Sequence, residues 1–315
     1  AVGYDPIAAG ASYLISNSVH IEAPSFNITA PLQITGNFAE GTNVKKYKLE
    51  DIIKPNSGFG INSGVVPVVS KSLTWRATPV INSSGNVDIW MEKIDYNDFT
   101  DGLWYADFGR ALDDKYMNAE GDAMKIYDKL DIIENEGDFR HIMAGLAGEV
   151  YANINQREAD IAKTFENSLD FIENSKNNTK ENVKVNIIAG KGKNSEKTDG
   201  VTGYDYSTAG VLGLREVERT YRHTFGYSLG YLHTGFEFND GNESEEWVDT
   251  IQLGVHSKYS MNDWKLRNDL TGRVSFHNVD RNIDWTAPNG RSEMNGMFET
   301  YSITSDNILG REFAL

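Results

Sequence analysis

Histidine, serine and glycine are the residues through which this sequence could do chemistry. No two histidines have zinc-ligand spacing such as His-Glu-x-x-His, and Ser207 lacks the Gly-x-Ser-x-Gly turn of a serine nucleophile. The glycines at 226, 230 and 235 alternate within a strand-like run rather than forming a phosphate loop. We therefore predict no catalytic, cofactor or metal site, and no enzyme. Besides His20, the histidines are scattered over different segments, namely His141, His223, His233, His256 and His277, of which the last two are expected to face a lumen.

Composition excludes several other classes of protein. The chain has 46 acidic and 30 basic residues, a formal net charge of -16, which argues against a nucleic-acid surface. It has no cysteine, so a disulfide scaffold and thiolate chemistry are excluded. No apolar run reaches the roughly 18 residues of a transmembrane helix. Contact with a membrane would therefore require a closed β-barrel.

The spacing of apolar residues changes twice along the chain. Residues 1–113 carry short strand-like runs broken by Pro24 and Pro31, like the last rungs of a β-solenoid, with a hairpin over 73–91. Residues 114–180 have helical spacing, including a mostly charged helix over 156–173. Residues 181–315 alternate with period two. We predict a passenger end, a helical linker and a sheet with these bounds.

The strands of the third segment are long and two-faced. They reach about 10 residues or more, as a strand that crosses a bilayer needs, and aromatic residues lie near several of their ends. Tight turns at 218–219 and 261–263 alternate with longer connections at 193–203, 239–246 and 280–295. In a soluble sandwich or a lipocalin-like barrel, the apolar face would point inward instead. The side chains predicted to face lipid are Phe225, Tyr227, Leu229, Tyr231, Leu253, Val255 and Leu270.

Four stretches resemble the autotransporter (type Va secretion) family. Leu146–Ala152 resembles the Leu-Ser-Gly-Glu-x-x-Ala element that precedes the family's barrel, and Gly203–Gly213 resembles its second strand. Phe225–Tyr231 resembles the third strand, and Gln252–His256 takes the place of the fourth. The resemblance covers roughly residues 139–315. The hairpin ending at 87–93 looks like the fusobacterial-type adhesin branch of the family.

The resemblance implies a mainly β fold with a helical linker. The expected order is the end of a β-solenoid passenger, then α-helices, then a partial antiparallel outer-membrane β-barrel. About six strands are recognisable, half of the family's twelve, and the sequence stops inside a strand at 312–315. We therefore expect a fragment that is truncated within the β-barrel.

The implied function is that of an outer-membrane translocator. Such a protein exports and anchors a surface-exposed passenger, here expected to be an adhesin. Its partners would be outer-membrane lipid, the barrel-assembly machinery and a host or bacterial surface ligand, without nucleic acid. The location would be the bacterial outer membrane, with the passenger at the cell surface. A passive outer-membrane porin and a soluble β-rich surface adhesin module remain as alternatives.

Two further expectations concern the lumen. We expect an acidic helix, including Glu166 and Asp170, to plug a pore with basic walls, although solvated faces would show the same pattern. Some autotransporters cut themselves at an Asn-Asn pair, but the residues around Asn177 and Asn178 do not match that motif. We expect a polar hinge there. The basic residues expected in the wall are Lys265, Arg267 and Arg273, together with Arg215, Arg222 and Lys258.

Overall fold

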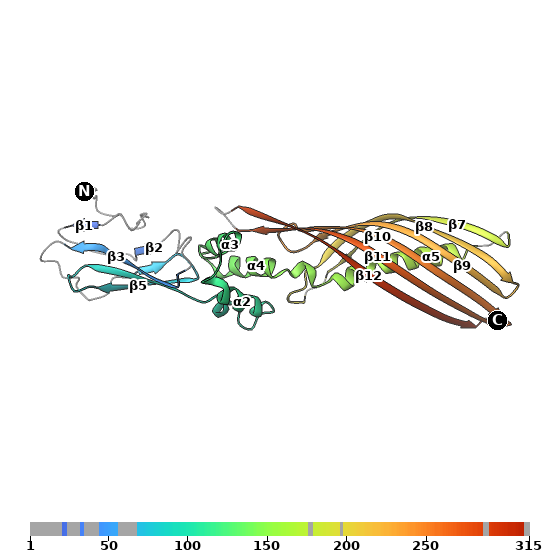
Figure 1. Ribbon diagram of the computed structural model, residues 1–315, viewed down its shortest axis with the longest axis horizontal. Helices are drawn as coiled ribbons and strands as arrows, with labels where there is room; N and C mark the ends of the chain where they lie inside the picture. Colours follow the sequence, from blue (N-terminus) through green and yellow to red (C-terminus); the bar gives the residue numbers. More distant parts are fainter. Residues whose placement is uncertain are drawn as a thin grey trace. The chain divides into compact units, whose positions relative to one another are not determined.

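The structure is a computed structural model, and it describes residues 21–23, 32–34, 44–55, 68–175, 179–195, 198–285 and 290–311. Asn177 and Asn178 lie outside the described residues. The chain divides into two units, of which the first is Ala1–Ala147 with Trp285–Gly290. The second is Gly148–Asp284 with Arg291–Leu315 (Figure 1). The division falls inside the segment 114–180 that the sequence pattern predicts as one linker.

The first unit contains a mixed sheet of four strands. Its order is β1 (Ile21–Ala23), β3 (Lys46–Pro55), β6 (Val87–Lys93) and β5 (Trp75–Ile81). β1 pairs with β3 in parallel, and the other pairs are antiparallel. The pairing of β5 with β6 confirms the predicted hairpin. A second, parallel pair joins β2 (Leu32–Ile34) to β4 (Val68–Ser70).

The turn between β5 and β6 needs a residue with positive φ and side-chain hydrogen bonds to its backbone, and its sequence supplies both. Gly85 has φ +78°, a conformation that costs glycine little. The side chain of Asn82 accepts hydrogen bonds from the backbone N–H groups of Ser84 and Asn86. Alternate residues of β6 then point into the core, where Val87, Ile89 and Met91 are buried.

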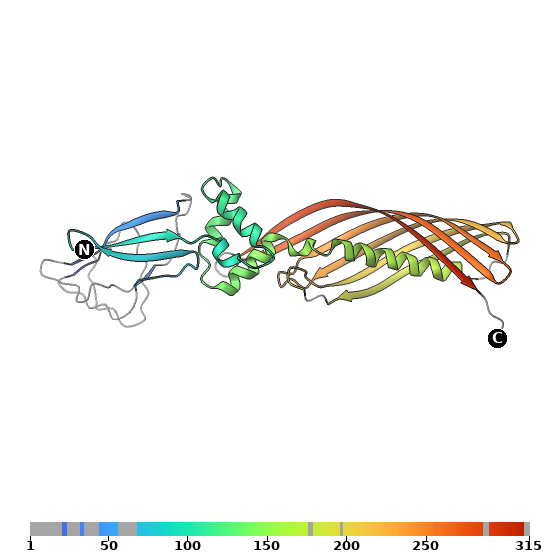
Figure 2. The same ribbon diagram turned by 90° about the horizontal axis from the view of Figure 1, so that it is seen from below.

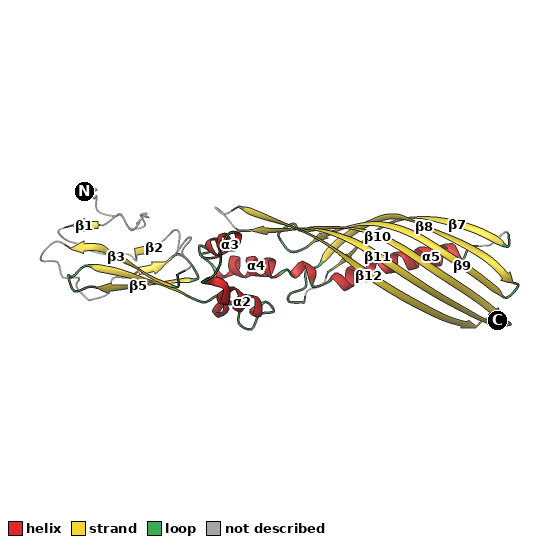
Figure 3. Ribbon diagram, viewed as in Figure 1, coloured by secondary structure: helices red, strands yellow, loops and turns green. Residues whose placement is uncertain are grey.

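Four helices complete the first unit: α1 (Asn97–Thr100), α2 (Ala106–Tyr116), α3 (Asp122–Leu130) and α4 (Glu136–Ala147) (Figure 3). Helical structure thus begins at Asn97, earlier than the predicted residue 114. α1 has only four residues, too few to show periodicity, and α2 begins at Ala106, before the residue at which the helical segment was expected to start. Gly109 is required by packing, because a Cβ there would lie 2.1 Å from Oγ1 of Thr100.

A buried carboxylate ties these helices to the sheet. Asp131 accepts hydrogen bonds from Tyr96 at 2.6 Å, Tyr116 at 2.8 Å and Thr74 at 3.0 Å. Lys93 at the end of β6 lies 3.1 Å from the same carboxylate. Burial lowers the pKa of the Lys93 ammonium and raises the pKa of the Tyr96 and Tyr116 hydroxyls. The hairpin and the helices therefore share one polar core.

The second unit is built on an antiparallel sheet of six strands. They are β7 (Glu181–Asn194), β8 (Tyr204–Thr220), β9 (His223–Phe238), β10 (Glu245–Met261), β11 (Trp264–Asp284) and β12 (Arg291–Arg311). Each strand pairs with the next along the chain, and within the described residues β7 and β12 do not pair. The sheet is therefore open, as expected for part of a barrel. The strands contain 14 to 21 residues, more than the roughly 9–11 that cross a bilayer.

Tight turns and longer connections alternate, as the sequence predicts. β10 and β11 are joined at Asn262-Asp263, where Asn262 has φ +51°. The first tight turn lies at Tyr221-Arg222 and not at the predicted 218–219, because β8 continues to Thr220 through an irregular register after Glu218. A long strand can continue with charged residues beyond its apolar part. The charged pair Glu218-Arg219 therefore belongs to β8 and does not form the turn.

One helix lies along a face of this sheet. A short 3-10 helix, η1 (Glu149–Tyr151), precedes α5 (Ile154–Glu173), and Figure 2 shows α5 running along the strands. Ile161, Phe165, Leu169 and Ile172 repeat every three or four residues, so they share one side of α5. They pack on apolar residues of the sheet, namely Ile188, Leu212, Leu214, Leu232, Phe236, Val248 and Val279.

Candidate functional site: the helix-bound face of the sheet

The sheet of the second unit has two different faces, because successive side chains of a strand point to opposite sides. One face contacts α5 and is called the inner face below. The other is the outer face, and it exposes large apolar side chains. Leu229 is 59% exposed, Leu253 62% and Leu270 49%. These values are high for apolar residues in the middle of long strands.

The residues predicted to face lipid all lie on the outer face. Tyr227, Tyr231 and Val255 are exposed there. Phe225 is only partly exposed, because its ring packs edge-on against Tyr227 with 5.0 Å between centroids. None of these side chains belongs to the core that contacts α5. Contact with lipid itself remains a prediction.

Part of the inner face is apolar and dry, which the sequence reading missed. A pore with basic walls implies an inner face that contacts water, but Leu232 and Phe236 of β9 pack against α5. Gly230 lies directly beneath Phe165, and a Cβ there would approach Cε1 of Phe165 to 2.5 Å. Glycine therefore serves close approach of the helix rather than a wet wall. The apolar stripe of α5 could have predicted this, because an apolar helix face must pack against an apolar surface.

A first ionic cluster joins the beginning of α5 to the sheet. Nε of Arg157 lies 2.6 Å from a carboxylate oxygen of Glu246, and both side chains are fully buried. His277 contacts Glu246 through Nδ1 at 2.7 Å and Glu158 through Nε2 at 3.1 Å. The His277 ring also stacks on Phe298 at 4.3 Å. A buried charge is tolerated only when it is paired, so each member requires the others.

A second ionic cluster lies at the end of α5. Asp170 lies 2.6 Å from Nη1 of Arg267, and Glu173 lies 3.3 Å from both Arg267 and Lys258. Lys258 also contacts Glu216 of β8 at 3.0 Å. The last turn of α5 is therefore joined to three strands by charged groups.

The predicted basic wall is only partly observed. Arg267 and Lys258 lie against the helix, but Arg273 donates to Gln252 at 3.3 Å and to Thr304 at 2.8 Å. Lys265 is exposed at the end of β11. Glu166 is exposed on α5.

Two residues expected in the wall lie elsewhere. Arg215 is on the outer face, where it contacts Glu181 at 3.4 Å. Arg222 lies in the tight turn, with its guanidinium 4.9 Å from the Tyr221 ring centroid. The reason is the register of β8, in which Leu212 and Leu214 point inward and Arg215 must point outward.

The sequence reading also missed the acidic partners on the strands. Glu216, Glu246 and Asp269 are buried on the inner face, although carboxylates in alternating strands look like solvated positions. His256 and His277 lie on the inner face, as predicted, but both are buried against carboxylates rather than facing an open lumen.

Long antiparallel strands with an apolar outer face and a charged helix on the inner face define the class of outer-membrane β-domains. Residues 183–315 match the family model of the autotransporter beta-domain, and residues 8–95 match that of the BigA beta sandwich domain. Residues 183–315 therefore carry an autotransporter beta-domain. No curated protein matches the chain.

The autotransporter beta-domain places residues 183–315 in the context of the bacterial outer membrane and supports the role of a translocator. Proteins of this family are in general assembled there by the barrel-assembly machinery. The family is not typically catalytic. No helix among the described residues is long and apolar enough to cross a membrane. The match over 8–95 favours a β sandwich over the β-solenoid that we expected for this segment.

Proposed function

We propose that this chain exports its N-terminal region to the cell surface and then holds it there, with α5 closing the lumen of the barrel. The observation that carries the proposal is the fully buried pair of Arg157 and Glu246. A translocator must conduct an unfolded chain and afterwards stop leaking. A helix held by ion pairs and by an apolar stripe meets the second requirement, because water cannot readily compete for buried pairs.

The exported region includes the sheet and helices of the first unit. Its hairpin is joined to its helices through Asp131 and Lys93, so the segment is stable only when both are folded. Folding outside the cell would bias export forward, because a folded hairpin cannot return through the pore. We further propose that the exported region acts as an adhesin toward a host or bacterial surface ligand. This finer statement is supported by the resemblance of 87–93 to adhesin autotransporters.

Single thiols test the orientation, since the chain contains no cysteine. Ser83→Cys places a thiol on the exposed hairpin turn, and Asp263→Cys places one in the tight turn between β10 and β11. A membrane-impermeant maleimide should label Ser83→Cys in intact cells and Asp263→Cys only after the outer membrane is permeabilised. Labelling of both variants only after permeabilisation would contradict surface display and favour a passive porin. Recovery of the chain in a detergent-free soluble fraction would favour a soluble adhesin module.

A further inference from the structure

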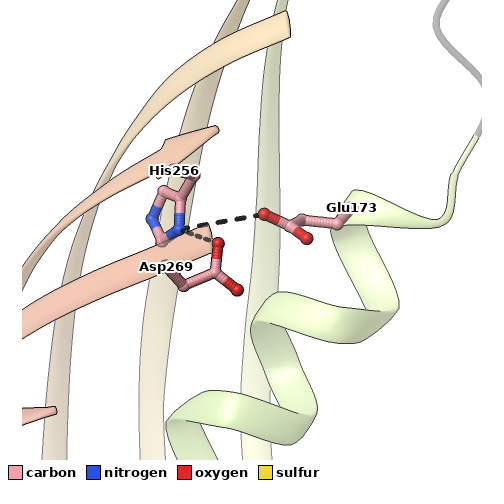
Figure 4. Close-up of side chains that lie close together, drawn as sticks. All are labelled: Glu173, His256 and Asp269. Atoms are coloured by element: carbon pink, nitrogen blue, oxygen red, sulfur yellow. Dashed lines mark hydrogen bonds and ion pairs between the residues drawn. The ribbon is translucent and has the colours of Figure 1, made fainter. Parts of the chain in front are cut away.

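Three side chains from different elements meet at the end of α5. Glu173 belongs to the last turn of α5, His256 to β10 and Asp269 to β11 (Figure 4). Nδ1 of His256 lies 3.0 Å from Oδ1 of Asp269 and 3.8 Å from Oε1 of Glu173. One ligand atom of each residue lies within 4.8 Å of the others. The side chains are only 1% to 4% exposed.

The second polar atom of each side chain is held by another residue. Nε2 of His256 lies 2.7 Å from Oγ of Ser228. Oδ2 of Asp269 contacts Nε of Arg267 at 2.5 Å, and Oε2 of Glu173 lies 3.3 Å from Arg267 and Lys258. Outer contacts of this kind orient metal ligands in proteins. They leave Nδ1, Oδ1 and Oε1 directed at one another.

A separate observation indicates that this arrangement suits a cation. Oε1 of Glu173 is buried and, among the described residues, receives no hydrogen bond. A buried carboxylate oxygen without a donor is costly. The surrounding charge is also acidic, since four carboxylates face three fixed cations. The carboxylates are Asp170, Glu173, Glu216 and Asp269, and the cations are Lys184, Lys258 and Arg267.

We propose that Glu173, His256 and Asp269 bind a divalent cation of the zinc type through Oε1, Nδ1 and Oδ1. Two ligand separations, 3.0 and 3.8 Å, bracket the edge of about 3.4 Å expected between ligands of a tetrahedral zinc ion. One imidazole with two carboxylates suits zinc, whereas calcium and magnesium prefer shells made of oxygen alone. A water molecule completes the tetrahedron.

The cation would connect α5 to two strands of the sheet. Its ligands come from α5, β10 and β11, so binding joins the last turn of the helix to the inner face. Zinc would therefore add to the ion pairs of Lys258 and Arg267 and tighten the closed state of the lumen. This inference concerns the closed state and does not require that the N-terminal region be exported.

Zinc binding by the intact protein, purified in detergent with a chelator and then freed of it, tests the inference. Competition with a chromophoric zinc indicator should show one site per chain. His256→Ala should weaken zinc binding by at least about 100-fold, and Ser228→Ala, which removes only the outer contact, by about 10-fold or more. His233→Gln is the matched control, because this exposed histidine lies on the outer face, away from both ionic clusters, and should leave zinc affinity unchanged.

Cobalt gives a readout that structural damage cannot imitate. Co²⁺ in the wild-type protein should produce the intense visible absorption of a tetrahedral site, and Glu173→Gln should abolish or reshape it while the heat-dependent gel mobility of the folded β-domain persists. The inference is overturned if the folded wild-type protein binds no zinc. It is also overturned if His256→Ala binds zinc as tightly as wild type, or if His233→Gln weakens binding equally.

Discussion

At the scale of single residues, the basic side chains of the inner face differ in how directly they contact α5. Arg267 reaches Asp170 and Glu173 on the helix. Arg273 donates to Gln252 and Thr304, which both belong to strands, and attracts Glu158 and Glu166 of α5 only through space. The two arginines are therefore not equivalent, although each lies on β11 and the sequence predicts the same role for both.

Charge reversal separates these two arginines. Arg267→Glu places a carboxylate beside Asp170, Glu173 and Asp269, so the end of α5 should be repelled from the sheet. We expect the conductance of the protein in planar bilayers to rise. Arg273→Glu reverses a charge that attracts Glu158 and Glu166 without contacting them, so it should raise the conductance less than Arg267→Glu. Equal conductance of wild type and Arg267→Glu would show that the ion pairs of Arg267 do not keep α5 in the lumen.

Ionisation of buried tyrosines predicts how the first unit responds to alkali. Burial raises the pKa of Tyr127 to about 12 from a usual value near 10, and its hydroxyl donates to the carbonyl of Leu112. A folded-state pKa above the unfolded value gives stability that is complete below pH about 10 and is lost as pH rises toward 12. The raised pKa values of Tyr96 and Tyr116 act in the same direction. The lowered pKa of Lys93 acts oppositely, but only below the ordinary lysine value of 10.5.

Pulse proteolysis of β5 and β6 between pH 10.5 and 12 measures this loss in the whole protein. Cleavage should increase with pH, and Tyr127→Phe should flatten the increase because one titrating group is removed. A pH dependence that is identical in the variant and in wild type would show that Tyr127 does not contribute.

At the scale of elements, the packing of α5 on β9 depends on one small residue. Gly230→Ala would place a Cβ 2.5 Å from Phe165, whose ring is fully buried and cannot easily move. Overpacking of this kind costs about 1–3 kcal/mol. We expect α5 to loosen, which limited proteolysis within 154–173 would detect. Gly272→Ala on β11 is the control, since its Cβ would meet nothing within 4 Å. Equal protection of both variants would contradict the packing described here.

Elements differ in how well the sequence predicted them. The strands around Leu229, Leu253 and Leu270 were recognisable because period-two alternation is a local pattern. The helix α5 was recognisable from its three- and four-residue spacing. By contrast, α1 was missed because four residues are too few to show periodicity. The start of α2 was placed too late, although Phe108, Leu112 and Tyr116 already recur at helical spacing.

The inner face was harder to predict, because its chemistry arises from contacts between distant segments. Nothing near Glu246 in the sequence marks it as the partner of Arg157, and Glu173 meets His256 and Asp269 only after the strands pair. The register of β8 likewise decides that Arg215 faces outward. Residue types and periodicity are readable from the sequence, whereas partners across the sheet require the fold.

At the scale of the whole β-domain, the two faces of the sheet lie in different environments, separated by one layer of strands. The outer face is apolar and exposed, and the inner face is paired with a helix. A lipid bilayer explains the first, because large exposed apolar surfaces are rare on proteins that contact only water. The open edges at β7 and β12 are satisfied only when the barrel is closed by further strands.

A nitroxide scan of residues 250–255 on β10, in the intact protein reconstituted in lipid vesicles, shows whether the outer face lies in lipid. Collisions with oxygen, which concentrates in lipid, should be frequent at positions 251, 253 and 255 and rare at 250, 252 and 254. A water-soluble nickel complex should reach none of the first three. Loss of the alternation, or ready access of the nickel complex to Leu253, would contradict an outer face that is bathed in lipid.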